Sequence, residues 1–120
     1  MRFAMLINGV EGEWDAAVDE SVKGGADPMA EVWAFMQRWE KAGKIADGGA
    51  ELASVRTAKT IRAGTDGEMV VTDGPYLELK EVIGGVLILE AADIDEAVAI
   101  GATWPIRGST SVEIRPVIEH

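Results

Sequence analysis

The chain has 120 residues, which suits one domain that buries about two-thirds of its unfolded surface. Apolar residues make up 48% of the sequence and charged residues 27%, a mixture typical of globular proteins and not of disordered ones. The 21 acidic and 11 basic residues leave a net charge of −10. Because this charge repels phosphate backbones and anionic lipid headgroups, we expect neither direct nucleic-acid binding nor membrane binding.

Two absences narrow the chemistry further. The sequence contains no cysteine, which excludes a disulfide framework, a thiolate nucleophile and a cysteine-based zinc site. The N-terminal apolar run, residues 3–7, is too short for a signal peptide, and no later run approaches membrane-spanning length. A cytoplasmic location is therefore expected.

The first elements predicted are a strand and a helix. Residues 3–7, "FAMLI", are apolar on both alternating faces, as in a strand covered on both sides. Asp27 can cap a helix, Pro28 suits the first helical position, and Gly43 suits its exit. The apolar stripe predicted for this helix consists of Met29, Val32, Trp33, Met36 and Trp39.

The second half of the chain predicts a hairpin, a strand, a helix and a closing strand. Alternation over Val55–Ile61, followed by the turn Asp66-Gly67, indicates an inserted β-hairpin. The run "GGVLILEA" indicates an interior strand. Asp93 and Glu96 form a capping pair for a helix that Pro105 ends. Alternation in "SVEIRPV", residues 111–117, indicates the last strand.

This order predicts an α+β fold of the ferredoxin-like, split βαβ type, with two helices on one face of an antiparallel sheet and a hairpin inserted. No repeat or linker divides the chain, so a single domain over residues 1–120 is expected. In the strand at residues 86–90, Val86 and Ile88 alternate with Leu87 and Leu89, which makes both faces of the sheet apolar. We therefore expect a homodimer that closes sheet against sheet.

One central motif resembles a known family. The pattern "DGPY.E.KE.IGG" matches the signature of the YCII-related family, in its DGPF-domain branch. Tyr76 stands where phenylalanine is more usual, and Leu79 where a small hydroxyl residue is common. The residues that carry the pattern are Asp73, Gly74, Pro75, Tyr76, Glu78, Lys80, Glu81, Gly84 and Gly85.

The resemblance extends over nearly the whole chain and implies a dimeric α/β barrel. It implies less about activity, because family members resemble small monooxygenases and muconolactone-isomerase-like proteins in fold only. Some relatives are linked to alternative sigma factors, which implies a regulatory role. One branch has been proposed to use a His-Asp pair, which cannot be transferred here because the single histidine is the terminal His120.

Asp73 is the candidate catalytic residue, and it has a structural alternative. An aspartate at the end of a strand can accept hydrogen bonds from nearby backbone N–H groups and organise a turn. "TDG" occurs twice, and only the second copy continues into Pro75 and Tyr76, which fix the direction of the chain and bring a ring to a cavity wall. A carboxylate held rigidly in this way could serve as general acid or base.

The outer candidates for ligand binding are Tyr76, Lys80 and Glu81, although adjacent charged residues are more often solvent-facing. No metal site and no cofactor are predicted, since "DIDE" lacks the pattern of a calcium loop. Two functions follow. The first is a small cofactor-independent enzyme that uses Asp73 on a small organic molecule; the second is a non-catalytic ligand-sensing or interaction module linked to a sigma-factor response.

Overall fold

The computed structural model describes residues 1–10, 24, 27–74, 81–106 and 108–120. Its main sheet has four strands in the order β2-β5-β1-β6, and every neighbouring pair is antiparallel. This order and two helices give the α+β, ferredoxin-like fold that the sequence predicts. The strands are β1 (Arg2–Gly9), β2 (Ile45–Glu51), β5 (Val82–Glu90) and β6 (Ser111–Pro116).

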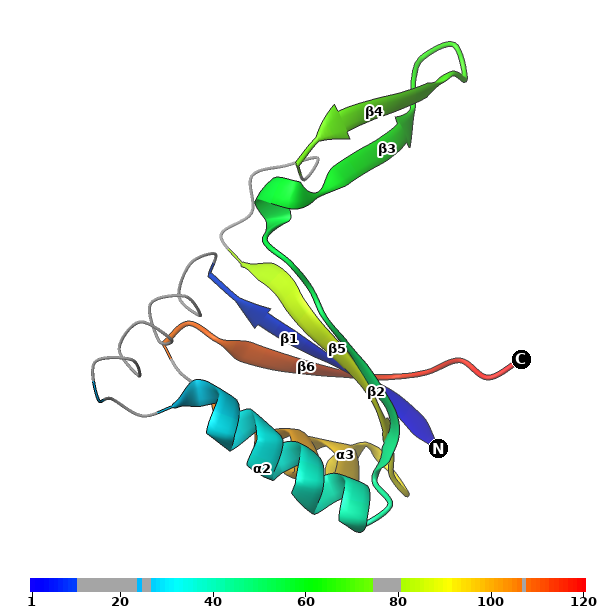
Figure 1. Ribbon diagram of the computed structural model, residues 1–120. Helices are drawn as coiled ribbons and strands as arrows, with labels where there is room; N and C mark the ends of the chain where they lie inside the picture. The colour runs from blue at the N-terminus through cyan, green and yellow to red at the C-terminus, as the bar shows by residue number, and fades with distance from the viewer. Residues whose placement is uncertain (11–23, 25–26, 75–80, 107) are drawn as a thin grey trace.

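Helices α2 (Pro28–Lys41) and α3 (Ile94–Gly101) both lie against the same face of this sheet (Figure 1). The predicted caps are confirmed. Asp27 Oδ1 accepts a hydrogen bond from Met29 N at 3.0 Å, and Asp93 Oδ1 accepts one from Glu96 N at 2.9 Å. Each cap satisfies a backbone donor that the first turn of a helix cannot pair internally.

The core lies between the helices and the sheet, because alternate residues of a strand point to the same face. Phe3 and Met5 of β1 and Leu87 and Leu89 of β5 point toward the helices and are at most 5% exposed. The helix side of this core consists of Phe35, Ala97 and Ile100, and Ala91 completes it.

The stripe predicted for α2 is wrong at one position. Trp33 is 61% exposed, whereas Phe35 is 4% exposed and packs its ring edge-on against Trp104, with 5.0 Å between ring centroids. Steps of three or four residues link Val32, Phe35 and Trp39 along the inner side of the helix, and Trp33 lies about 100° away from Val32. Phe35 therefore occupies the position that the sequence pattern gave to Trp33.

The second face of the sheet is apolar at its centre and carries no helix (Figure 1). Ala4, Leu6, Val86 and Ile88 point to this side and are only partly buried; we call them the open face. Leu6 lies directly opposite Val86, and Ala4 directly opposite Ile88, so the four form one contiguous patch.

A β-hairpin projects from the side of the sheet that the helices leave uncovered (Figure 1). It comprises the short 3-10 helix η1 (Val55–Thr57) and strands β3 (Lys59–Ala63) and β4 (Met69–Asp73), which form a separate two-stranded sheet. We call residues 55–74 the arm. The predicted strand at Val55–Ile61 thus begins only at Lys59, because Ser54 Oγ accepts a hydrogen bond from Arg56 N and starts a helical turn instead.

The projecting arm makes the chain extended. Its Cα radius of gyration is 16.7 Å, whereas a compact chain of this length has about 13.5 Å. The principal extents of 50 × 46 × 18 Å describe a broad, thin molecule. A single chain therefore leaves much of its surface uncovered.

Candidate functional site

Asp73 is the last residue of β4, at the base of the arm, and its side chain is 86% exposed. It lies directly across the ladder from Lys59, whose Nζ donates a hydrogen bond to Asp73 Oδ1. The adjoining backbone is anchored as well: Gly74 N donates to Ala58 O, and Thr60 Oγ1 donates to Gly74 O, each at 2.7 Å. Asp73 therefore belongs to a fixed strand end, paired with a cation.

The two "TDG" copies lie at opposite ends of β4. Asp66 is at the tip of the arm, where its backbone N–H donates to Glu68 Oε2 at 3.1 Å and Gly67 N donates to Gly64 O at 3.1 Å. The first copy is thus a hairpin turn, as predicted. The second copy lies at the base of the arm, beside the main sheet, so the same three letters occupy different surroundings.

The other candidates are placed only in part. Tyr76 and Lys80 lie outside the described residues. Glu81 is exposed at a bend just before β5. Of the candidate residues, the structure therefore describes two, and both are acidic: Asp73 at the end of β4 and Glu81 just before β5.

Gly84 forms a β-bulge. The register of β1 with β5 pairs Ile7 with Gly85 and Asn8 with Ile83, so Gly84 is the extra residue. Its carbonyl accepts a hydrogen bond from Leu52 N at 2.8 Å, where the chain leaves the main sheet toward the arm. The bulge thus gives Gly84 a structural role at the entry of β5.

Sequence reasoning missed Lys59, although a signal was present. Lys59 precedes Asp66 by seven residues and Asp73 follows it by seven, so a hairpin centred on Asp66 places the two opposite each other. Opposite charges directly across an antiparallel pair stabilise it modestly. The register of the hairpin, and not the motif around Asp73, identifies this partner.

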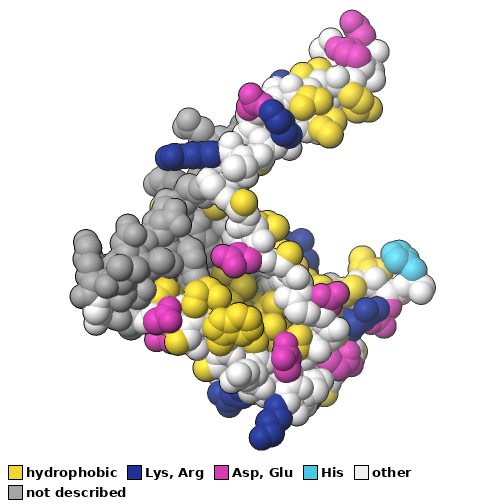
Figure 2. Space-filling model, viewed as in Figure 1, with side chains coloured by type: hydrophobic (Ala, Val, Ile, Leu, Met, Phe, Trp, Pro, Cys, Tyr) yellow, Lys and Arg dark blue, Asp and Glu magenta, His cyan; other side chains and the backbone are white. Residues whose placement is uncertain are grey.

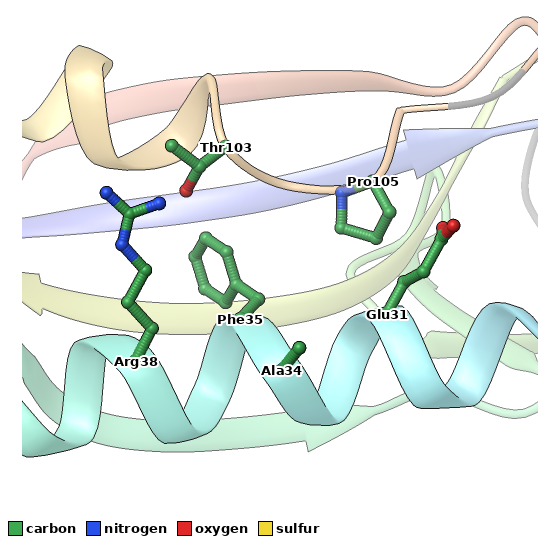
Figure 3. A pocket seen from close by; sticks show the side chains of 6 residues that line it. All are labelled: Glu31, Ala34, Phe35, Arg38, Thr103 and Pro105. Carbon is green, nitrogen blue, oxygen red and sulfur yellow. The ribbon is translucent and has the colours of Figure 1, made fainter.

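A groove of about 380 Å³ lies on the helix side, between α2 and the chain after α3 (Figure 3). Phe35 points across it toward Thr103 and Pro105, with Glu31 and Arg38 on either side. Thr103 Oγ1 accepts a hydrogen bond from Trp39 Nε1 at 2.9 Å and donates one to Ile100 O at 2.7 Å. The hydroxyl that lines the groove therefore ties α2 to α3.

A second groove of about 310 Å³ runs between α3 and β6. Its lining is apolar, and neither groove includes Asp73 or Glu81. The lining residues are Ile94, Val98, Gly101, Ala102, Ile106, Val112 and Ile114. Without a polar side chain, this groove has nothing that would orient a reacting group.

Glu96, in the first turn of α3, has a lowered pKa. The side-chain hydrogen bond from Lys44 Nζ, at 2.9 Å, holds the pKa of Glu96 below its usual value, and the backbone N–H of Ala92 adds to the effect. This ion pair joins the strand entry at Lys44 to α3. The pair therefore fixes the start of α3 against the chain that enters β2.

Within the described residues, no three His, Asp or Glu side chains gather closely enough to hold a metal ion. No described helix has the length and the apolar character needed to cross a membrane.

The sequence is similar to a known protein family along its whole length. The family model of the YCII-related domain matches residues 1–120. The chain is also 33% identical over 124 residues to an uncharacterised protein of Rhizobium meliloti (strain 1021), an alignment that covers 98% of this chain and 92% of that protein. The chain therefore belongs to the YCII-related domain family.

Proposed function

We propose that the chain works as a homodimer that binds a small organic molecule in a barrel formed by two sheets. The open face carries this proposal: Ala4, Leu6, Val86 and Ile88 form an apolar patch at the centre of a sheet that helices cover on one side only. A contiguous apolar patch on a water-soluble chain marks an interaction surface. A second copy offers the same patch, and a two-fold dimer covers both at once.

The chemistry of the chain limits the ligand. A net charge of −10 disfavours anions, and the apolar open face favours a molecule with little charge. Asp73 and Glu81 supply carboxylates at the ends of β4 and β5. Such a site suits an uncharged or weakly cationic organic molecule.

Catalysis by Asp73 is the second candidate. The anchoring of its strand end by Ala58, Thr60 and Lys59 supports it, because general acid–base catalysis needs a carboxyl group fixed in position. The membership of the DGPF branch and the link to a sigma factor rest on the resemblance of residues 73–85 to that branch, and both remain predictions. Co-purification with a sigma factor at native expression levels would test the link.

Assembly is tested by light scattering and sedimentation at micromolar concentration. We expect a dimer for the natural sequence and a monomer for Val86→Lys, because a lysine buried there lies between Leu6 and Ala50, neither of which offers a counter-ion. The control is Val98→Lys, which places the same charge at a half-exposed position on α3 and should stay dimeric. A monomeric mass for the natural sequence would remove the barrel.

The ligand is sought by mass spectrometry of molecules released from natively purified protein. A binding module returns the molecule unchanged, whereas an enzyme converts it. If Asp73 is a general acid or base, Asp73→Asn lowers turnover about a hundredfold or more and changes stability little, since the amide oxygen still accepts a hydrogen bond. Asp66→Asn is the control and should leave turnover unchanged; wild-type turnover by Asp73→Asn would exclude the catalytic role.

A further inference from the structure

The two faces of the arm differ in character. Across the ladder, Ile61 pairs with Val71 and Ala63 with Met69, so these four side chains share one face. Three of them are far out in solvent: Ile61 is 66% exposed, Met69 69% and Val71 59%. The opposite face consists of Thr60, Arg62, Val70 and Thr72. One side of the arm is therefore an apolar surface in water (Figure 2).

Nothing described in the same chain covers this surface. β3 and β4 pair only with each other among the described strands, and the arm projects away from the main sheet (Figure 1). An isolated two-stranded hairpin is marginally stable in water, because it needs a third strand or a packed partner to bury its apolar side. Among the described residues, the apolar side of the arm therefore has no covering partner.

We infer that this contact is a second copy of the chain, with the apolar face of each arm packed on the partner. The inference rests on the proposed homodimer and adds a second contact to it. The arm stands on the same side of the sheet as the open face (Figure 1). A copy that covers the open face therefore meets the arm, and two-fold symmetry gives each copy the other's arm.

The charge of the arm fits this occupant. Arg56, Lys59 and Arg62 balance Asp66, Glu68 and Asp73, so the arm is neutral in a chain whose net charge is −10. Two copies repel each other through their excess acidic residues, and a neutral surface is where they can approach. The same balance disfavours a nucleic acid or an anionic membrane, both of which need an excess of basic residues.

The dimensions favour a contribution from the arm to the contact. Taking strand spacing and rise, the four-stranded face projects roughly 400 Å² and the arm about 160 Å² more. A standard stable interface buries about 800 Å² of accessible surface on each partner. The arm thus enlarges a modest sheet-to-sheet contact by about two-fifths.

The arm also brings chemistry to the interface. The Lys59–Asp73 pair ends the same face that carries Ile61 and Val71. When the arm packs on the partner, this pair lies at the edge of the contact. The Asp73 side chain, 86% exposed in one chain, then lies beside the partner. The candidate site is in that case formed by both copies.

The experiment places one charge on either face of the arm. Val71→Lys should raise the dimer dissociation constant about 30-fold or more, as expected for a residue central to a contact. Thr72→Lys, the next residue on the opposite face, should change it less than about threefold. Both variants should keep the helical circular dichroism of the natural protein, because the arm lies outside the core that the helices form with the main sheet.

A fluorescent label tests the same contact without relying on a variant that weakens the dimer. The chain has no cysteine, so Val71→Cys and Thr72→Cys each take a single environment-sensitive dye. We expect blue-shifted emission from position 71 in the dimer, which reverts on dilution, and no such change from position 72.

The outcomes distinguish the arm contact from the sheet-to-sheet dimer on which it rests. A wild-type dimer with an unchanged dissociation constant in Val71→Lys overturns the arm contact and leaves the sheet dimer standing. A dye at position 71 that stays shielded at a concentration where light scattering gives a monomer shows the arm folded on its own chain, which also overturns the inference. A wild-type monomer overturns the dimer itself.

Discussion

Gly49 in β2 offers the sharpest test of the backbone geometry. Its φ is +64°, and a Cβ placed there would lie 1.6 Å from Val86 O and 2.6 Å from the carbonyl carbon of Val86. Both distances are far inside van der Waals contact. In Gly49→Ala, β2 must therefore move away from β5, or the peptide must change its conformation.

A matched control separates the cost of the left-handed backbone conformation from the cost of the clash with Val86. Gly43, just after α2, has a φ of +72° and open space within 4 Å of its Cβ position. Gly43→Ala should therefore lose only the cost of the left-handed conformation, about 1–2 kcal/mol. Gly49→Ala has the same cost and must also disturb the pairing of Ala50 with Val86, so we expect about 3–5 kcal/mol in total.

The assay is urea unfolding followed by the fluorescence of the four tryptophans, at one fixed protein concentration because a dimer's stability depends on it. A difference of about 2 kcal/mol or more between the variants supports the close approach of β2 to β5. Equal stability of Gly49→Ala and Gly43→Ala would refute it.

Three further predictions concern the core, the pH response and nucleic acid. Phe35→Ala should cost about 3–5 kcal/mol, because it removes a buried ring that packs on Trp104, whereas Trp33→Ala should cost well under about 1 kcal/mol; thermal melts compare them. The lowered pKa of Glu96 means that the stability it contributes is present above its ordinary pKa and is lost as pH falls through the folded-state pKa. In urea midpoints measured from pH 7 down to about 3, Glu96→Gln should therefore be less stable than the natural protein at neutral pH and approach it in acid. Mobility-shift assays with duplex DNA at physiological salt should show no complex, and a clear shift would contradict the electrostatic argument.

The local parts of the fold could be predicted from the sequence. Asp27 and Asp93 cap helices because a short acceptor followed by an apolar period has few other uses. The rotation of α2 could not be predicted as well, because Trp33 and Phe35 are both large and apolar, and only the packing against Trp104 decides between them. The ferredoxin-like sheet could be predicted from the order of strands and helices along the chain, although pairing of strands distant in sequence leaves little local trace.

For the candidate site, too, some features could be predicted from the local sequence and others could not. Asp73 could be found from its motif, and its partner Lys59 from the register of the hairpin. What covers the pair could not be predicted from one chain, because none of the other described strands pairs with the arm. An apolar alternation predicts that a face is buried and does not name the molecule that buries it.

The place of β1 at the centre of the sheet also affects how the chain emerges during synthesis. Its two partners, β5 and β6, come from residues 82–90 and 111–116. At about 5–20 residues per second, the roughly 70 residues between β1 and β5 take on the order of 4–15 s to synthesise. For that time an apolar strand waits without neighbours, while α2 and the hairpin can already form from local contacts. Rapid overproduction should therefore favour aggregation through β1, and slower synthesis or a holding chaperone should relieve it.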